Sequence, residues 1–286
     1  MELEIESFTH VVSAAWLAEH FNHPRVAIAD CRFSLTDPDL GRRQYQQGHI
    51  PGAHYFDLNR DLSSPVGQHG GRHPLPEPNQ LAAKLAAAGI VSESEPEPTW
   101  VIAYDDARFA YAARFWWLLR HLGHARVAVL DGGFSQWQAA RYPVTDALPV
   151  SQSGHFIPQI QRTDVLDIIA VRSRQGQPGI VLVDSREGDR YRGECEPIDP
   201  IAGHIPGAVN YPWQSVTNAP GYIRPIADQQ QHWAELTSAS EIVVYCGSGV
   251  TACVNLLSLE LAGLSQTKLY AGSWSDWCSY ADLATE

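Results

Sequence analysis

A cysteine in a glycine-rich segment is the residue best suited to covalent chemistry in this sequence. Cys246 directly follows an apolar, β-branched run at residues 241–245. The residues after it are Gly247, Ser248, Gly249, Val250 and Thr251. Two glycines allow the backbone to turn tightly and to direct N–H groups inward, and the helix expected next adds the positive end of its dipole. The segment therefore predicts a loop that stabilises a thiolate or a persulfide anion on Cys246.

The corresponding position in the first half of the chain carries a carboxylate. Residues 100–104 resemble residues 241–245, and Asp105 follows them as Cys246 follows the second run. In an open parallel sheet, reactive groups lie beyond the carboxyl ends of the strands. We therefore expect only the second half to be catalytic, with the first half as its structural partner.

Four short segments occur twice, in the same order. The pairs are residues 26–32 and 180–186, 48–53 and 203–208, 100–105 and 241–246, and 132–137 and 272–277. Such an ordered repeat predicts a tandem duplication. We place the first domain at residues 1–145 and the second, catalytic domain at residues 165–286. The linker between them, residues 146–164, contains Pro149 and Pro158 and shows no clear period.

Each half alternates short apolar runs with helical patterns. Buried parallel strands are predicted at residues 26–31, 100–104, 127–130, 180–184, 241–245 and 268–270. Helices are expected at residues 79–88, 107–122 and about 249–262. The alternation predicts an α/β protein with two domains, each a mostly parallel sheet flanked by helices on both faces.

Composition excludes several classes of partner. The net charge of −12 argues against nucleic acid, because phosphate binding favours a basic face. No run approaches the roughly 18 apolar residues of a membrane span, and the first ten residues lack the apolar stretch of a signal peptide. The five cysteines are far apart, which argues against a disulfide framework and a zinc site. We expect no nucleic acid or membrane partner and a cytoplasmic location.

The residues 246–252, Cys-Gly-Ser-Gly-Val-Thr-Ala, resemble the active-site loop of 3-mercaptopyruvate sulfurtransferases in the rhodanese family. The two Gly-His-Ile-Pro-Gly-Ala segments and the Gly-Ser-Trp-Ser-Asp-Trp segment also resemble this family, over about residues 10–284. The resemblance implies tandem rhodanese-like domains, the first with aspartate in place of the cysteine, as at Asp105. It further implies a ping-pong reaction without a metal or organic cofactor. Cys246 would take sulfur from a small anionic donor and pass it to a thiol such as thioredoxin, or to cyanide.

The resemblance also implies residues that bind the donor. Arg190 matches the substrate-binding arginine of the family, whose forked N–H groups suit a carboxylate. The mercaptopyruvate enzymes often have a second arginine some nine residues later, but the comparable region of this chain, residues 194–199, contains no arginine. Arg192 or a residue of the long loop at residues 63–78 could take that role. The alternative for Arg190 is a surface salt bridge to Glu187 or Glu194.

Some family members have an aspartate and a histidine from the first half near the cysteine. The candidates here are Asp57, Asp61, His69 and His73, although one alignment places Asn59 at the acidic position. Each of them is also compatible with an ordinary loop residue. Trp274 is expected in the core or at the wall of the site. His49 and His204 occur in both halves, so we interpret them as structural.

Three other functions are compatible with parts of the pattern. Thiosulfate could be the main donor, but it is a dianion and would gain from cationic residues at positions 247 and 248. A cysteine phosphatase needs an arginine six or seven residues after the cysteine, where this chain has Ala252 and Cys253. A binding module without catalysis would retain its function when Cys246 is replaced by serine.

Overall fold

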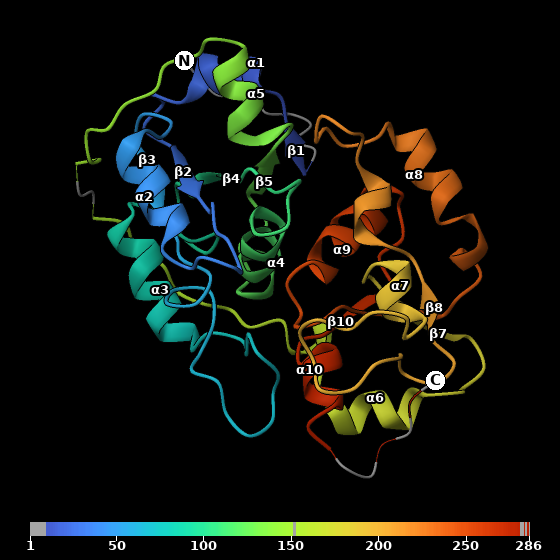
Figure 1. Ribbon diagram of the computed structural model, residues 1–286. Helices are drawn as coiled ribbons and strands as arrows, with labels where there is room; N and C mark the ends of the chain where they lie inside the picture. Colours follow the sequence, from blue (N-terminus) through green and yellow to red (C-terminus); the bar gives the residue numbers. More distant parts are fainter. Residues whose placement is uncertain (1–9, 151–152, 281–282, 284, 286) are drawn as a thin grey trace. The chain divides into compact units, whose positions relative to one another are not determined.

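The structure, a computed structural model, describes residues 10–150, 153–280, 283 and 285. The chain divides into two units (Figure 1). Unit 1 comprises residues 1–61, 78–160 and 219–222, and unit 2 comprises residues 62–77, 161–218 and 223–286. Two short segments are therefore exchanged: the long loop of the first half belongs to unit 2, and residues 219–222 belong to unit 1.

Unit 1 is built on a five-stranded sheet with the strand order β1-β5-β4-β2-β3, in which each strand pairs in parallel with its neighbours. Parallel neighbours require crossover connections, which here include helices. The elements are β1 (Val11–Val12), α1 (Ala14–His20), β2 (Val26–Asp30), α2 (Leu40–Gln47), β3 (Ala53–Tyr55), α3 (Pro78–Ala87), β4 (Trp100–Tyr104), α4 (Ala112–His121), β5 (Val127–Leu130) and α5 (Gly133–Ala139).

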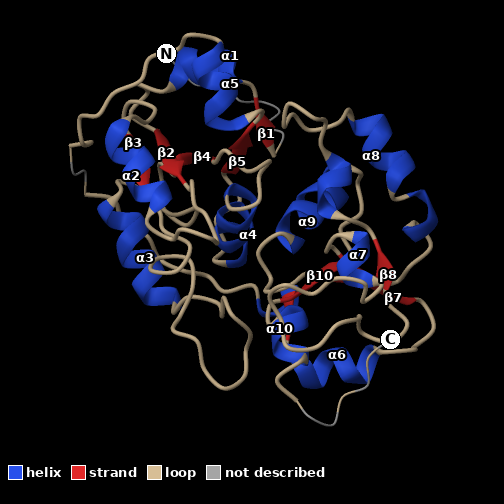
Figure 2. Cartoon of the chain, viewed as in Figure 1, coloured by secondary structure: helices blue, strands red, loops and turns tan. Residues whose placement is uncertain are grey.

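The core of unit 1 follows the alternation of side chains along its strands. Ile102 and Tyr104 of β4 share one buried cluster with Leu17 of α1 and Trp137 of α5. Helix α4 also packs on β4 and β5, and nearly all of its side chains are buried. Figure 2 shows the strands of each unit lying among its helices.

Unit 2 repeats this arrangement with the strand order β6-β10-β9-β7-β8, again with parallel pairs. Its elements are η1 (Arg162–Asp164), β6 (Val165–Leu166), α6 (Ile168–Arg174), β7 (Ile180–Asp184), α7 (Gly188–Tyr191), β8 (Val209–Asn210), η2 (Trp213–Val216), α8 (Ile226–His232), η3 (Ala234–Leu236), β9 (Glu241–Tyr245), α9 (Ala252–Leu261), β10 (Thr267–Tyr270) and α10 (Ser273–Trp277).

The two sheets have equivalent registers. The β7–β9 pair aligns Asp184 with Tyr245, as the β2–β4 pair aligns Asp30 with Tyr104. In unit 2, Val243 and Tyr245 pack with Trp274 and other residues of α10, as the equivalent residues of unit 1 pack with α5. The predicted α/β fold class and the duplication are confirmed.

Two predicted helices begin later than expected. Helix α4 begins at Ala112 rather than at residue 107, because Arg108 and Phe109 have left-handed φ values of 56° and 71°. Helix α9 begins at Ala252 rather than at about residue 249, because Gly249 has a φ of 75°. A non-helical loop therefore separates the end of the central strand from the following helix in both units.

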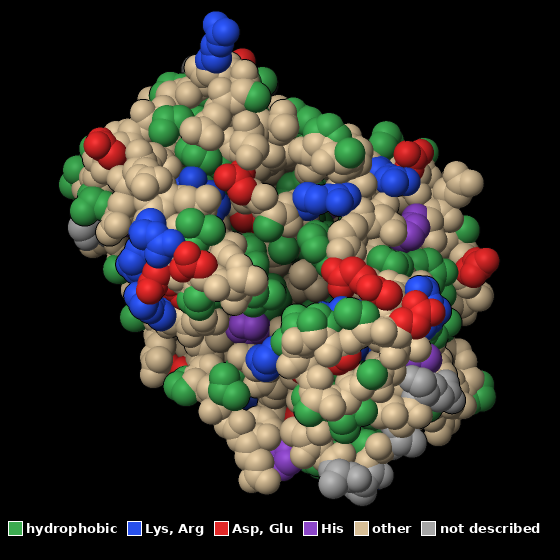
Figure 3. All heavy atoms as spheres, viewed as in Figure 1, with side chains coloured by type: hydrophobic (Ala, Val, Ile, Leu, Met, Phe, Trp, Pro, Cys, Tyr) green, Lys and Arg blue, Asp and Glu red, His purple; other side chains and the backbone are tan. Residues whose placement is uncertain are grey.

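The outer surface carries charges of both signs. On the face drawn in Figure 3, Lys and Arg side chains lie among Asp and Glu side chains rather than in one basic surface. Within the described part of the chain, no helix has the length and hydropathy needed to cross a bilayer.

Candidate active site

The backbone at Cys246 is fixed to the start of α10. The Cys246 N–H donates to Ser273 Oγ at 3.2 Å, and the Cys246 carbonyl accepts from the Trp274 N–H at 3.0 Å. One residue later, the Gly247 carbonyl accepts from the Ser275 N–H at 2.9 Å. These bonds hold the first residues of the loop between β9 and α9 in one position.

The loop turns at Gly249, where a side chain could not be accommodated. Its φ is 75°, and a Cβ at this position would lie 2.3 Å from the carbonyl oxygen of Ala271. Both the left-handed backbone and the close approach require glycine here. The prediction that this glycine permits a tight turn is confirmed.

The thiol of Cys246 differs in its surroundings from the other buried or partly buried thiols. Its residue is 2% exposed, and the sulfur has no hydrogen-bond partner among the described residues. Burial raises the pKa of Cys31 well above its usual range and raises that of Cys278 to about 12. Cys253 is fully buried, and its Sγ lies 3.5 Å from the Gly249 carbonyl oxygen. Cys246 is therefore the thiol presented by the glycine-rich loop itself.

In unit 1, the equivalent loop surrounds the carboxylate of Asp105. One oxygen accepts from the N–H groups of Ala107 and Phe109 at 2.8 and 3.1 Å, and the other accepts from those of Tyr111 and Ala112 at 2.8 Å each. Burial raises the pKa of Asp105, and the N–H groups of Ala112, Ala107 and Tyr111 oppose that effect. A loop at this place in the fold can thus direct four backbone donors at one anionic group.

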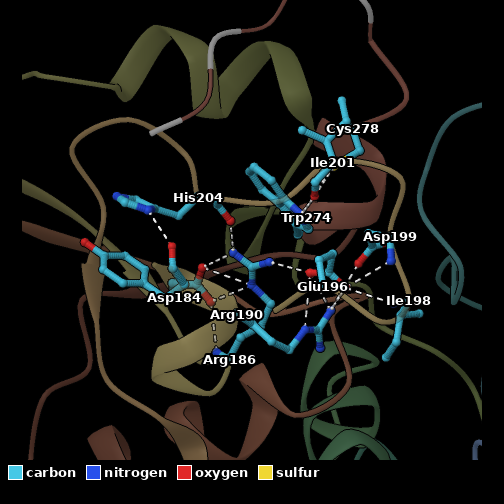
Figure 4. Close-up of polar contacts among 12 residues, drawn as sticks. Asp184, Arg186, Arg190, Glu196, Ile198, Asp199, Ile201, His204, Trp274 and Cys278 are labelled. Carbon is cyan, nitrogen blue, oxygen red and sulfur yellow. Dashed lines mark hydrogen bonds and ion pairs between the residues drawn. The ribbon is translucent and has the colours of Figure 1, made fainter. Parts of the chain in front are cut away.

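Arg190 lies in a cluster of ionised side chains with Arg186, Glu196 and Asp199 (Figure 4). Its Nη2 lies 2.8 Å from Glu196 Oε1 and 3.3 Å from Asp199 Oδ2, and its side chain is 12% exposed. Its acidic partners are thus Glu196 and Asp199 rather than the predicted alternatives Glu187 and Glu194. Both nitrogens Nη1 and Nη2 lie 3.7 Å from the position that a Cβ of Gly247 would take.

The acidic partners of Arg190 are buried. Burial favours a higher pKa for Glu196, but hydrogen bonds from the Asp199 N–H and from Arg190 outweigh it, and the pKa is lowered. Burial raises the pKa of Asp199, against the opposing effect of nearby Arg72 and Arg190. Arg186 also pairs with Glu196 at 3.2 Å, so the cluster continues to the buried Asp184 at the end of β7.

Arg72 comes from the long loop that belongs to unit 2. Its Nη1 forms an ion pair with Asp199 Oδ1, and its backbone N–H donates to Ser275 Oγ at 3.1 Å. Its Nη2 lies 3.0 Å from the position that a Cβ of Gly247 would take. Residue 247 therefore lies beneath two guanidinium groups, those of Arg72 and Arg190.

His73, the next residue, makes a side-chain hydrogen bond to the loop. Its Nδ1 lies 2.7 Å from Ser248 Oγ, and both residues are buried. Ser248 is the second residue after Cys246, so His73 contacts the loop that carries this cysteine.

The other predicted site residues lie elsewhere. Asp61 belongs to unit 1, where it pairs with Lys84 at 3.2 Å. His69 Nδ1 lies 2.7 Å from Ser279 Oγ, and its ring stacks on Tyr280. These contacts attach the long loop to the residues that follow α10. Arg192 is exposed and pairs with Glu194 at 2.8 Å.

Trp274 is fully buried. Its Nε1–H donates to the Ile201 carbonyl at 3.0 Å, and Arg186 stacks on its ring. Trp274 is thus a core residue.

Among the described residues, no group of three or more His, Cys, Asp or Glu side chains is arranged to hold a metal ion.

The two repeated histidines have equivalent structural contacts. His49 Nδ1 lies 2.7 Å from the Tyr45 carbonyl oxygen, and His204 Nδ1 lies 2.8 Å from that of Tyr191. Each imidazole also stacks on the ring of the same tyrosine. These contacts agree with a structural role for both residues.

No motif of the sequence distinguishes Arg72, and Glu196 and Asp199 lie in a segment notable only because it lacks an arginine. Arg72 and Asp199 are 127 residues apart in the chain, and no motif relates them. The available signal was the length and glycine content of the loop at residues 63–78.

Comparison with known proteins identifies the class. The Rhodanese-like domain family matches residues 13–140 and 169–280, one match in each half. The chain belongs to this family and contains two such domains.

Relatives over the whole length refine this assignment. The chain is 45% identical to a probable 3-mercaptopyruvate sulfurtransferase of Pseudomonas aeruginosa, over 95% of both chains. It is 36% identical to a putative thiosulfate sulfurtransferase, SseB, of Mycobacterium tuberculosis, over 89% of this chain and 88% of SseB. The crystal structure of the 3-mercaptopyruvate sulfotransferase SseA of Escherichia coli has a TM-score of 0.79 and 31% identity, covering 94% of this chain and all of SseA.

Proposed function

We propose that this protein is a sulfurtransferase that moves sulfur from 3-mercaptopyruvate to a thiol or to cyanide through a persulfide on Cys246. The observation that carries the proposal is the loop that follows the central strand. In unit 1 such a loop holds the carboxylate of Asp105 with four N–H groups. In unit 2 the residue at that strand end is a cysteine, so the loop suits an anionic sulfur.

The reaction has two balanced steps. The Cys246 thiolate attacks the sulfur of the donor, an S–S bond forms, and the C–S bond of mercaptopyruvate breaks. The leaving enolate of pyruvate takes up the proton that the donor thiol gives up, so pyruvate and an anionic persulfide result. A thiolate or cyanide then attacks the outer sulfur, which leaves as a new persulfide or as thiocyanate and restores the Cys246 thiolate.

The hydrogen-bonded pair of Ser248 and His73 supports the proton transfer. The Oγ–Nδ1 distance is 2.7 Å, and the pair lies two residues along the chain from the nucleophile. In the proposed reaction, this pair transfers the proton of the donor thiol to the leaving enolate.

Relatives of both donor classes exist, so the choice of donor rests on the site. Gly247 and Ser248 bring no charge to the loop, and the nearby arginines Arg72 and Arg190 are paired with Asp199 and Glu196. A dianion such as thiosulfate gains more from unbalanced positive charge than a carboxylate does. We therefore favour mercaptopyruvate, with thiosulfate as the second candidate.

The proposal extends to the acceptor, the location and the domain roles. Thioredoxin or cyanide would act as acceptor, and the cytoplasm would be the location, in line with the five cysteines in no C-x-x-C pair. The first domain, residues 1–145, would be non-catalytic, and the second, residues 165–286, would carry the nucleophile.

The mass of the intact protein tests the reaction class. After exposure to mercaptopyruvate without acceptor, we expect a gain of one sulfur atom that cyanide removes and that Cys246→Ser does not acquire. A binding module would keep its mass and tolerate Cys246→Ser. The specificity constants kcat/KM for the two donors test the donor assignment, and a preference for thiosulfate would refute it.

A further inference from the structure

The segment that carries Arg72 is fixed to unit 2 at several points. The Gly70 N–H donates to Asp276 Oδ1 at 2.7 Å, and the Arg72 N–H donates to Ser275 Oγ. At Gly71, a Cβ would lie 2.4 Å from the Gly272 carbonyl oxygen, so the two backbones are in close contact. The backbone of Arg72 therefore has a defined position next to the start of α10.

The guanidinium of Arg72 is held beside that of Arg190 by one carboxylate. Asp199 is only 3% exposed at its side chain, and its two oxygens pair separately with Arg72 Nη1 and Arg190 Nη2. Side-by-side cations repel each other unless an anion lies between them, and Asp199 supplies that anion.

In each guanidinium, one terminal nitrogen forms no hydrogen bond with the described residues. Within the described part of the chain, Arg72 Nη2 and Arg190 Nη1 have no hydrogen-bond partner, and both lie close to Gly247, at 3.0 and 3.7 Å from its Cβ position. Two unpaired donors from different guanidinium groups thus meet over the residue next to Cys246. Their positive charge and their closeness to the same point at Gly247 suit an anion with two oxygens, one for each donor.

We propose that Arg72 and Arg190 together bind the carboxylate of the sulfur donor and that Asp199 is the positioning residue that sets their separation. The inference rests on the proposed function, which supplies a donor with a carboxylate next to its carbonyl. It assigns donor recognition to a residue of the first half of the chain, 174 positions before Cys246 (246 − 72).

The charge balance of the cluster makes recognition selective. Arg72, Arg186 and Arg190 face Asp184, Glu196 and Asp199, so three positive charges meet three negative charges. Such a cluster offers directed donors without a large net positive charge. A single carboxylate is therefore favoured over a dianion.

Removal of the donor's own carboxylate provides the test. Mercaptoacetone has the thiol and ketone of mercaptopyruvate but a methyl group in place of the carboxylate. We expect Arg72→Gln to lower kcat/KM for mercaptopyruvate by about 10- to 100-fold, the size of a lost charge-assisted hydrogen bond. For mercaptoacetone the change should stay within about twofold, because the lost contact has no counterpart there.

Arg192→Gln is the matched control. Arg192 is exposed and paired with Glu194, so its loss should leave kcat/KM unchanged for both donors. Arg72→Lys keeps the charge without the fork and should fall between Arg72→Gln and the wild type. An equal loss for both donors after Arg72→Gln, or no loss for mercaptopyruvate, would overturn the proposal.

Asp199→Asn tests the positioning role. It should raise KM for mercaptopyruvate, leave kcat within about twofold and leave turnover of mercaptoacetone unchanged. A fall in kcat with both donors would indicate a general structural role instead and would refute positioning.

Binding of pyruvate separates this inference from the proposed reaction. Calorimetry on Cys246→Ser protein needs no turnover, and Arg72→Gln in that background should weaken pyruvate binding at least about tenfold. Unchanged pyruvate affinity would refute the inference even if the persulfide forms. Lack of a persulfide with intact, Arg72-dependent pyruvate binding would refute the proposed function alone.

Discussion

Ser273 combines a strained backbone with a contact to the candidate nucleophile. Its φ is 56°, and its buried hydroxyl accepts from the Cys246 N–H and donates to the Tyr270 carbonyl. The equivalent residue of unit 1 is Gly133, with a φ of 62° and no side chain. The serine thus retains a glycine-like conformation because its hydroxyl supports the Cys246 backbone.

Two substitutions of Ser273 separate strain from support. Ser273→Ala keeps the strained φ and leaves the Cys246 N–H without its acceptor, so we expect a loss of about 2 kcal/mol in the free energy of unfolding. Ser273→Gly loses the same bond but relieves about 1 kcal/mol of strain, so its loss should be smaller. Both should lower kcat/KM by about tenfold through misplacement of the nucleophile.

Urea unfolding and steady-state kinetics check these expectations. The informative comparison is between the two variants, because they share the lost hydrogen bond and differ in backbone strain. Equal unfolding free energies for Ser273→Ala and Ser273→Gly would show that the left-handed conformation stores no strain.

The site residues that could be predicted from the sequence are those that lie in short, contiguous motifs. Cys246, its loop glycines and Arg190 lie in short motifs, and the structure places them near one another. His73 was one of four candidates in a loose alignment, and its contact with Ser248 spans 175 residues. Such contacts depend on tertiary packing, which residue types and spacing do not specify.

At the scale of elements, the turn between β9 and α9 depends on Gly249. Helix patterns in the sequence extended through this turn because apolar periodicity continues across it. The left-handed φ and the 2.3 Å approach to Ala271 explain why the helix begins only at Ala252.

Substitution of Gly249 by alanine should disrupt this turn. Strain at positive φ costs about 1 kcal/mol, and the overlap with the Ala271 carbonyl must shift the backbone between β10 and α10. We expect a loss above about 3 kcal/mol in unfolding free energy and no persulfide formation. Urea unfolding and the intact mass after mercaptopyruvate treatment provide the measurements.

Gly207→Ala in the same unit is the control. Gly207 has a similar φ of 78°, but a Cβ there would meet no atom within 4 Å. Gly207→Ala should lower the free energy of unfolding by about 1 kcal/mol and should retain persulfide formation. Similar losses for the two variants would mean that backbone conformation alone, and not the contact with Ala271, determines the cost.

At the scale of the whole molecule, sequence repetition was enough to predict the architecture. The motif pairs at the ends of β2 and β7 and of β4 and β9 fall at equivalent registers of the two sheets. The exchange of residues 62–77 into unit 2 could not be predicted, because it follows from side-chain contacts such as Arg72 with Asp199. Periodicity predicts helices and strands, whereas the unit into which a loop packs depends on contacts with residues far away in the sequence.

Buried histidines should make the fold sensitive to acid. Burial lowers the pKa of His124 below 6.5, against the raising effect of Glu93, and the fully buried ring lies 2.9 Å from the Thr99 carbonyl oxygen through Nε2. Below about pH 6.5, His124 is therefore protonated more readily in the unfolded chain than in the folded protein. The stability contributed by neutral His124 is present above that pH and is lost as the pH falls.

His124→Gln should remove this component. Glutamine can still donate to the Thr99 carbonyl but does not titrate, so the decline in unfolding free energy between pH 7 and pH 5.5 should be about 1 kcal/mol smaller than in the wild type. Thermal unfolding followed across this pH range gives the comparison. Other acid-sensitive groups are common to both proteins, so the difference in slope isolates this residue.

His155 provides the reference because its side chain is largely exposed, at 68%. His124→Gln should have a flatter slope than His155→Gln, whatever the stability of either variant at pH 7. If the two variants have the same slope, protonation of His124 is not coupled to unfolding. The acid response would then have to come from carboxylates or from the other histidines with a pKa lowered mainly by burial, His23, His54 and His232.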